Sequence, residues 1–348
     1  MNSDKSSISN RKKEHLELCI TDKVSFKTKT TGFEKYDFKH CAITEVDISK
    51  ISFKCKFFGR KINHPFLISC MTGGTDEANN INAQLAKVAE NIGIPIGVGS
   101  QRQALENEDF LNSFKVVRKN APNVPILSNI GAAQVVQFKS IDTVQKIIDM
   151  VEANALVIHT NPLQELLQDE GENNFKGLLK KIKEIVKRIK IPVIVKEVGA
   201  GISYEAAKKL LDVGVKGIDV AGAGGTSWAG VEILRSKKRE DHYFWDWGLP
   251  TAFCIKEVSK LKREYKFTLI GSGGIGNSLD AAKAFALGAD FVASARPVLM
   301  KLNEGDAKGV EEFIKKLFNE IKQIMFLTGS KNLKELRNKK LMKMEVLT

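Results

Sequence analysis

Eight short apolar runs, separated by longer amphipathic stretches, constrain the fold of this 348-residue chain more than any other feature of its sequence. Apolar runs that alternate with helical patterns are typical of a parallel sheet covered by helices. Eight such units in a chain of this length predict a closed (β/α)8 TIM barrel. The alternative is a doubly wound open sheet, which usually has fewer strands and an early GxGxxG turn that is absent here. The runs span residues 66–69, 94–98, 124–128, 156–159, 193–196, 217–220, 268–271 and 291–294.

Amphipathic helices are expected between these runs, most clearly over residues 81–90, 178–187, 204–212 and 279–287.

Several segments lie outside the repeating unit. Residues 1–64 form an N-terminal arm and a cap for the barrel floor, in which residues 52–63 are expected to be a hairpin. Residues 65–328 would form the barrel and residues 329–348 a basic C-terminal tail. A long insertion, residues 226–249, separates the sixth and seventh units. Connections of this length in compact domains are commonly lids or binding loops.

Composition narrows the class of protein. No apolar run is long enough to span a bilayer and the N-terminus is polar, so a cytoplasmic protein without membrane contact is expected. The five cysteines are widely spaced and form no CxxC pair, which argues against a disulfide framework or a zinc site. The net charge of +13 is spread along the chain. A non-catalytic scaffold that binds RNA is an alternative, but no aromatic residues interleave a basic stripe.

Glycine-rich and polar segments follow all eight predicted strands, and barrel active sites are built from these loops. After the seventh run come Gly273, Gly274 and Gly276, and after the eighth come Ala295 and Arg296. Glycine lets backbone N–H groups approach an anion, and a following helix N-terminus adds a positive dipole. These loops therefore predict a phosphate cradle, with a plain chain turn as the alternative.

The sequence HTNPLQE follows the fourth run. Asn161 is expected to cap the next helix and Pro162 to begin it. This leaves His159 and Gln164 without a structural explanation, although a histidine satisfied by the backbone is an open alternative. Glu165 offers a hard oxygen ligand, and Mg²⁺ often takes one carboxylate together with phosphate oxygens and waters.

Lys196 ends the fifth apolar run. A lysine at a barrel mouth could form a Schiff base with a carbonyl substrate, or it could stabilise an anion. The alternative is a lysine whose side chain extends off the barrel rim into solvent.

Taken in order, the motifs at the strand ends resemble those of the type 2 isopentenyl-diphosphate isomerases. The resemblance runs from about residue 11 to the end of the barrel. Each motif is short, but their common order makes the set specific. The motifs are RKKEH (11–15), MTGG (71–74), GSQR (99–102), SNIG (128–131), HxNxxQE (159–165), VKEVG (195–199) and GGTSW (224–228).

The resemblance implies an FMN-dependent and Mg²⁺-requiring enzyme of isoprenoid biosynthesis. It would interconvert isopentenyl diphosphate and dimethylallyl diphosphate with no net redox change, with NADPH as the reductant of the flavin. Homotetramers or larger homo-oligomers are implied as well. FMN would contact Cys70, Met71, Thr72, Ser100, Asn129, Lys196, Thr226, Gly273, Gly274, Gly276, Ala295 and Arg296. The substrate would contact Arg11, Lys12, Ser100, Gln101, Arg102, His159, Asn161 and Gln164, and Mg²⁺ would bind Glu165. The family often has a basic residue at the position of Gly276, so only backbone contact is expected there.

The implied chemistry assigns catalytic roles to Gln164, His159 and Lys196. Protonation of an alkene builds carbocation character, which a reduced flavin could stabilise while it relays the proton. Lys196 would favour the anionic reduced flavin, and Gln164 would assist at the hydrocarbon end. Arg11 and Lys12 are predicted to belong to an arm that orders over the diphosphate. The alternative function is an FMN-dependent oxidoreductase of the hydroxy-acid oxidase or dihydroorotate dehydrogenase kind.

Overall fold

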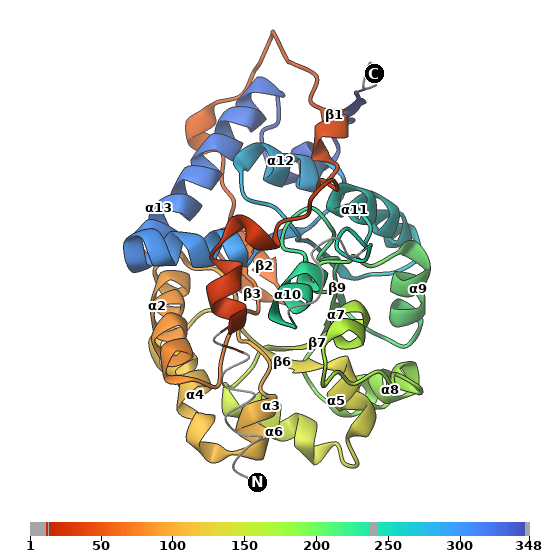
Figure 1. Cartoon of the computed structure of the whole chain (residues 1–348). Coiled ribbons are helices and arrows are strands. Elements are labelled where there is room, and N and C mark those ends of the chain that lie inside the picture. The colour runs from red at the N-terminus through yellow and green to blue at the C-terminus, as the bar shows by residue number, and fades with distance from the viewer. Residues whose placement is uncertain (1–11, 13, 237–242, 345–348) are drawn as a thin grey trace.

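The computed structural model describes residues 12, 14–236 and 243–344, and its centre is a closed barrel of eight parallel strands (Figure 1). The predicted (β/α)8 barrel is therefore confirmed. Each apolar run contributes one strand, and the ring closes where Val292 of the last strand pairs with Phe66 of the first. The strands are β4 (Phe66–Ile68), β5 (Ile96–Gly97), β6 (Ile126–Gly131), β7 (Ala155–His159), β8 (Val193–Lys196), β9 (Gly217–Asp219), β10 (Thr268–Gly271) and β11 (Phe291–Ser294).

Helices surround the barrel, and local sequence explains their ends. The Thr75 hydroxyl accepts a hydrogen bond from the backbone N–H of Ala78 at the start of α2, and Gly93 ends that helix with a φ of 77°. Gly305 and Asp306 leave helical geometry within α13, which divides it in two. The helices are α2 (Asp76–Ile92), α3 (Arg102–Glu106), α4 (Asn112–Asn120), α5 (Ala132–Gln137), α6 (Asp142–Met150), α7 (Pro162–Leu167), α8 (Leu178–Arg188), α9 (Tyr204–Asp212), α10 (Trp228–Arg235), α11 (Thr251–Ser259), α12 (Ser278–Ala286), α13 (Arg296–Leu327) and α14 (Leu333–Arg337).

The four stretches predicted to be helical correspond to α2, α8, α9 and α12. Short 3₁₀ turns complete the helical structure: η1 (Asp22–Val24), η2 (Phe33–Lys35), η3 (Ile48–Lys50), η4 (Glu108–Phe110) and η5 (Lys260–Arg263).

A hairpin closes the floor of the barrel, at the amino ends of its strands. Strands β2 (Cys55–Phe57) and β3 (Arg60–Ile62) pair antiparallel within the segment predicted to form it. Phe57 and Ile62 are buried in one apolar cluster with barrel residues that include Ile194 and Phe291. The hairpin therefore fills this end of the barrel with apolar side chains.

Residues 24–31, which precede the hairpin in the chain, lie at the opposite end, the mouth of the barrel. The backbone N–H of Ser227 donates to the carbonyl of Val24 over 2.7 Å, and Ser25 forms an antiparallel bridge with Thr226. Further along, Ala252 N–H donates to the Thr31 carbonyl over 2.9 Å. The N-terminal region thus contacts both ends of the barrel, since residues 24–31 lie at the mouth and β2–β3 at the floor.

The insertion at residues 226–249 contributes a helix to the mouth. Helix α10 packs against α7 in an apolar cluster that contains Ala229, Ile233 and Trp245. Gly230 lies so close to the Trp245 indole that an added Cβ would be 2.8 Å from the ring. Part of the insertion is therefore a packed wall of the mouth.

The segment predicted as a basic C-terminal tail has packed structure as far as residue 344. Leu333 and Leu336 of α14 are buried, and the Arg337 guanidinium donates to the Ala289 and Asp290 carbonyls over 3.1 and 2.7 Å. Strand β12 (Met342–Lys343) pairs with β1 (Tyr36–Asp37). Apolar residues spaced among the lysines account for this packing.

Across the described residues, none of the helices has the length and apolar character required to cross a membrane.

Candidate active site

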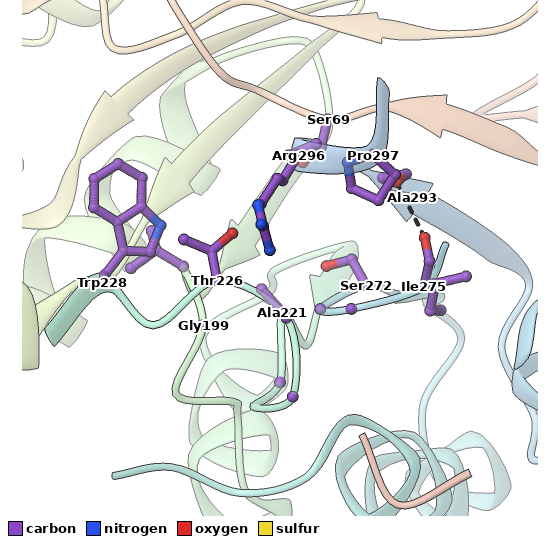
Figure 2. A pocket seen from close by; sticks show the side chains of 18 of the residues that line it. Ser69, Gly199, Ala221, Thr226, Trp228, Ser272, Ile275, Ala293, Arg296 and Pro297 are labelled. Atoms are coloured by element: carbon purple, nitrogen blue, oxygen red, sulfur yellow. Dashed lines mark hydrogen bonds between the residues drawn. The ribbon is translucent and has the colours of Figure 1, made fainter. Parts of the chain in front are cut away.

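Two adjoining cavities lie at the carboxyl ends of the strands, where barrel enzymes place their active sites. The glycine-lined cavity, of about 260 Å³, is bordered by the loops that follow β9, β10 and β11 (Figure 2). The polar cavity, of about 250 Å³, is bordered by the loops that follow β4 to β8 and by N-terminal residues. The two cavities share Lys196, Val198, Thr226, Trp228, Ala295 and Arg296.

The structure brings most of the predicted site residues into these two cavities. Arg11 lies outside the described residues, and Gln101 and Gly276 line neither cavity. Predicted residues that line the cavities are Lys12, Cys70, Met71, Thr72, Ser100, Arg102, Asn129, His159, Asn161, Gln164, Glu165, Lys196, Thr226, Gly273, Gly274, Ala295 and Arg296.

Glycine backbone forms one side of the glycine-lined cavity because side chains do not fit there. Gly273 and Gly274 have φ values of 101° and 70°, which favour glycine. A Cβ added to Gly273 would lie 2.1 Å from the Gly222 carbonyl oxygen, and one added to Gly225 would lie 2.5 Å from the Gly274 nitrogen. An exposed glycine backbone suits a phosphate group, because its N–H groups can approach the anion closely. The residues present therefore fit the phosphate of FMN.

Arg296 reaches into the glycine-lined cavity from the start of α13 (Figure 2). Its guanidinium also binds the N-terminal segment: Nε donates to the Cys19 carbonyl over 3.0 Å and Nη1 to the Ser25 hydroxyl over 3.0 Å. Nη2 donates to the Thr21 carbonyl over 2.7 Å and to the Asp22 carboxylate over 2.6 Å. These bonds use four of the five guanidinium N–H groups. The predicted phosphate contact is therefore also the attachment point of residues 19–25.

His159 ends β7 and faces the polar cavity as a neutral imidazole. Burial, together with the charge of Lys196, lowers the pKa of His159 to about 3. Its Nδ1 lies 2.9 Å from the Asn129 side-chain oxygen, which can only accept. Nδ1 therefore carries the proton, and Nε2 is left as an acceptor.

Lys196 belongs to a group of buried charges at the ends of β8 and β9. Its Nζ donates to the Glu197 carbonyl over 2.7 Å, and its backbone is in register with Asp219 on the next strand. Burial raises the pKa of Asp219, while the Lys196 charge opposes that shift. Asp219 also accepts a hydrogen bond from the Ser272 hydroxyl in the loop after β10. These contacts hold the lysine in place and argue against a side chain that extends into solvent.

The Glu197 carboxylate organises the loop after β8. It accepts the backbone N–H groups of Val198 and Gly199, each over 2.6 Å, and that of Gly201 over 3.2 Å. Burial raises the pKa of Glu197, and the backbone donors oppose this shift. The loop that borders both cavities is thus fixed by a carboxylate beneath it.

The side chains after β7 form a hydrogen-bonded row. Pro162 begins α7 as predicted, and Asn161 occupies the N-cap position, but its side chain does not cap the helix backbone. Its amide instead donates to Gln164 Oε1 over 3.1 Å and to Glu165 Oε1 over 3.0 Å. The predicted side-chain cap is therefore wrong: the two bonds from the NH₂ group orient the amide, and its oxygen, the atom that would accept a backbone N–H in a cap, has no partner among the described residues.

Glu165 fits the chemistry of a magnesium ligand. It is buried, and within the described part of the chain its Oε2 accepts only the Glu172 backbone N–H, over 2.7 Å. The Asn161 side-chain oxygen nearby is buried without a hydrogen-bond partner. Within the described ranges no cluster of three or more His, Cys, Asp or Glu residues could hold a metal. A single carboxylate beside a free amide oxygen suits Mg²⁺, which takes its other ligands from phosphate and water.

Cations border the polar cavity at its entrance. Lys12 donates to the Gly73 carbonyl and lies 6.0 Å from the centre of the Phe114 ring. Arg102 donates to Glu106 over 2.9 Å and lies 3.8 Å from Glu172, but its side chain stays partly exposed. These basic groups, together with Arg296, favour an anionic ligand.

Gln101 faces away from the cavities, contrary to the predicted substrate contact. It is fully buried: its Nε2 donates to the Ile147 carbonyl over 2.9 Å, and its Oε1 accepts the Asn129 backbone N–H over 2.9 Å. Gln103, two residues later, lines the polar cavity instead, with a buried Oε1 that has no hydrogen-bond partner. Gly276 lies outside the cavity lining, where an added Cβ would meet only Pro297, at 3.5 Å.

Several residues of the site were missed by the sequence analysis. His15 lines the polar cavity and contacts Glu232, which lies buried behind it on α10. In the sequence, His15 could have been found from its place in the RKKEH motif. Glu232 could have been found from its position shortly after the GGTSW motif. Asp219 could have been found as an acidic residue that ends an apolar strand.

Comparison with known proteins identifies what this arrangement resembles. The family model described as FMN-dependent dehydrogenase matches residues 5–108 and 154–343. An isopentenyl-diphosphate delta-isomerase of Pelodictyon phaeoclathratiforme is 43% identical over 345 residues, covering 95% of this chain and 96% of the relative. One of Nostoc sp. is 44% identical over 340 residues, covering 97% of this chain and 96% of the relative.

Solved structures with the same fold include a mandelate oxidase mutant with (S)-mandelic acid, which has a TM-score of 0.68 and 15% identity. That match covers 98% of this chain and 99% of the other. A flavocytochrome b2 mutant with sulfite has a TM-score of 0.67 and 20% identity, covering 92% and 80% of the two chains. At these identities the likeness shows the barrel fold alone.

Proposed function

The chain belongs to the FMN-dependent dehydrogenase family and, within it, to the isopentenyl-diphosphate delta-isomerases, and on that premise we propose that it interconverts isopentenyl diphosphate and dimethylallyl diphosphate with FMN and Mg²⁺. One observation carries the proposal. Residues between Lys12 and Met300 line two cavities that meet at Lys196, Thr226 and Arg296. One cavity suits a phosphate, and the other combines cations with a buried carboxylate.

FMN would be held by the glycine-lined cavity and by the residues that the two cavities share. Gly273 and Gly274 offer backbone to its phosphate, and Thr226 and Lys196 line both cavities. When bound in its reduced form, FMN supplies an electron-rich ring that can exchange protons. The buried Lys196 cation provides electrostatic support for negative charge at this point.

The diphosphate of the substrate would lie in the polar cavity. Lys12 and Arg102 supply positive charge, and Glu165 would bind the Mg²⁺ that neutralises the remaining phosphate charge. The predicted contribution of Arg11 stays a prediction.

Moving the double bond requires that one proton is added at one carbon and that a different proton is removed from another carbon. His159 is neutral and has an acceptor at Nε2, so it can orient or accept but has no acidic proton to give at neutral pH. Gln164 is held at both ends of its amide, by Asn161 and by Glu232, and would position the hydrocarbon end. Side chains here thus orient the substrate and limit the paths open to its protons.

Other features of the proposal rest on the resemblance. NADPH is proposed as the reductant, a homotetramer or larger assembly as the oligomeric state, and a proton addition and elimination as the mechanism. These features separate the proposal from an oxidoreductase of the hydroxy-acid oxidase kind, which would consume reductant or oxidant stoichiometrically.

The decisive experiment incubates the purified protein with isopentenyl diphosphate under anaerobic conditions, with FMN, NADPH and Mg²⁺ each present or omitted. Dimethylallyl diphosphate is expected only when all three are present, with NADPH consumed in catalytic amounts. A product that forms without FMN, or reductant use in proportion to turnover, would contradict the proposal.

A further inference from the structure

Glu232 joins three segments of the chain behind the polar cavity without lining it. It is 1% exposed on α10, and its Oε1 lies 3.0 Å from His15 Nε2 and 2.9 Å from Gln164 Nε2. Its Oε2 accepts a hydrogen bond from Arg235 Nη1. His15 belongs to the helical residues 14–19, which Figure 1 shows in red beside α10. The proposed mechanism uses this carboxylate only as one of the two partners of Gln164.

The charge of Glu232 dictates the orientation of the Gln164 amide. Burial would raise the pKa of Glu232, but hydrogen bonds from His15 and Gln164 and the Arg235 charge together hold it below its usual range. An ionised carboxylate only accepts hydrogen bonds. Gln164 must therefore turn its NH₂ group toward Glu232.

The orientation of the Gln164 amide in turn fixes the orientation of the Asn161 amide. Once the NH₂ of Gln164 faces Glu232, its Oε1 is the atom that accepts from the Asn161 amide, over 3.1 Å. Asn161 donates to Glu165 as well, so its own oxygen is the atom left without a partner. One buried carboxylate thus sets the direction of two amides in the polar cavity.

His15 connects the N-terminal segment to Glu232 and, through it, to Gln164. Its Nε2 shares one oxygen of Glu232 with Gln164, and its ring meets Trp228 edge-on at 5.1 Å. Lys12, three residues earlier, donates to the Gly73 carbonyl across the cavity. The segment that carries Lys12 to the cavity therefore also supplies the His15 contact to Glu232.

We infer that Glu232 is a positioning residue for the isomerisation and that the N-terminal segment, through His15 and Glu232, fixes the orientation of the Gln164 amide. This inference rests on the proposed function. It differs from a purely structural role for the buried carboxylate, because it requires the effect of His15 to depend on Gln164.

A double-mutant cycle with His15→Ala and Gln164→Ala tests this dependence on the FMN-loaded enzyme. We expect His15→Ala to lower kcat by roughly 10- to 100-fold, since misplacement of a positioned group costs up to about that factor. The KM for isopentenyl diphosphate and the flavin spectrum should change little. In the Gln164→Ala background, His15→Ala should lower kcat by less than about 3-fold, because coupled residues are not additive.

Two further variants sharpen the result. His15→Gln keeps a donor that can reach Glu232 and should recover part of the lost kcat. Glu14→Gln is the matched control, because Glu14 accepts a hydrogen bond from Arg235 over 2.9 Å, whereas Gln164 donates to Glu232. Its kcat should stay near that of the unmodified protein.

The results distinguish a failure of the coupling through Glu232 from a failure of the proposed isomerase activity. If the losses from His15→Ala and Gln164→Ala multiply, the coupling through Glu232 is wrong even though the enzyme isomerises its substrate. The same conclusion follows if His15→Ala leaves kcat unchanged. If the unmodified protein forms no dimethylallyl diphosphate, the proposed function fails first. Glu232→Gln provides an independent check when it folds, and the His15 variants do not alter the buried carboxylate itself.

Discussion

The floor and the mouth of the barrel bury their side chains in different ways. At the floor, Phe57 and Ile62 of the hairpin pack against apolar strand residues, and this burial stabilises the fold by the hydrophobic effect. At the mouth, Lys196, Asp219 and Glu232 are 8%, 1% and 1% exposed, although buried charges are costly unless they are paired and hydrogen-bonded. The comparison teaches that the floor buries apolar side chains that only stabilise the fold, whereas the mouth buries charged groups suited to chemistry.

The largest expected effect is on stability at the floor. Phe57→Ala should lower the free energy of unfolding by about 3–5 kcal/mol, since it removes a buried aromatic ring and leaves a cavity. Denaturant unfolding would measure the loss, and kcat of the protein that remains folded should be unchanged. Lys56→Ala, on the exposed side of the same strand, is the control and should have little effect. A fall in kcat with intact stability would break the division between the two ends.

A substitution at the mouth should act chiefly on turnover. Lys196→Met removes a buried cation from both cavities and should lower kcat by about 10²–10³-fold, the range seen when one preorganised electrostatic group is lost. Turnover is compared on folded protein at equal FMN loading, because loss of the charge that offsets buried Asp219 also destabilises the protein. Lys283→Met is a matched control, because Lys283 is also buried but donates to the Phe33 carbonyl away from both cavities. If both lysine variants impaired turnover equally, the assignment of Lys196 would be contradicted.

A smaller effect is expected from the proposed metal ligand. Glu165→Gln should raise the Mg²⁺ concentration needed for half-maximal activity by roughly 10- to 100-fold, as loss of a metal-site group typically does. A magnesium titration of initial rates measures the shift. Glu170→Gln removes an exposed carboxylate from the same region and should leave the titration unchanged. Identical magnesium curves for Glu165→Gln and the unmodified protein would remove Glu165 from the site.

The smallest expected effect is on the pH dependence of stability, to which one buried histidine at each end of the barrel contributes. Burial lowers the pKa of His64 at the floor, where it packs against Phe318 at 4.6 Å, and burial lowers that of His159 at the mouth to about 3. The unfolded chain therefore binds these protons first as the pH falls below about 6.5, and stability decreases by at most about 1.4 kcal/mol per pH unit for each histidine.

Substitution should flatten this dependence at either end but affect turnover only at the mouth. His64→Phe and His159→Asn should both reduce the loss of unfolding free energy between neutral and mildly acidic pH, measured by denaturant titration at each pH. Only His159→Asn should lower kcat. Equal pH dependence of stability in the unmodified protein and both variants would show that neither histidine is held neutral by the fold.

The strands could be predicted because each is a continuous apolar run, and the loops after them because polar and glycine-rich segments follow every run. Side-chain direction could not be predicted in the same way. Gln101 and Gln103 lie at the start of α3, and only packing against α6 decides that Gln101 faces away from the cavity. Asn161 has the sequence of a helix cap, but its NH₂ group donates to Gln164 and Glu165, and its oxygen does not accept a backbone N–H of the helix.

Contacts between segments far apart in the chain also could not be predicted from the sequence. Glu232 has the appearance of a solvent-facing residue in a short helix, and its burial depends on residues more than 200 positions earlier in the chain, such as His15. The bonds from Arg296 to residues 19–25 are equally invisible in the sequence, since nothing local to Arg296 indicates that the N-terminal segment returns to the mouth.

The attachment of residues 19–25 to Arg296 has a kinetic consequence. The hairpin fills the amino end of the barrel, so a nucleotide in the glycine-lined cavity can exchange only through the end that these residues partly cover. Dissociation through this end would require the guanidinium to release its partners on residues 19–25. The dwell time of the coenzyme on the protein would be governed by detachment of the chain's own beginning, and less by the strength of the phosphate contacts alone.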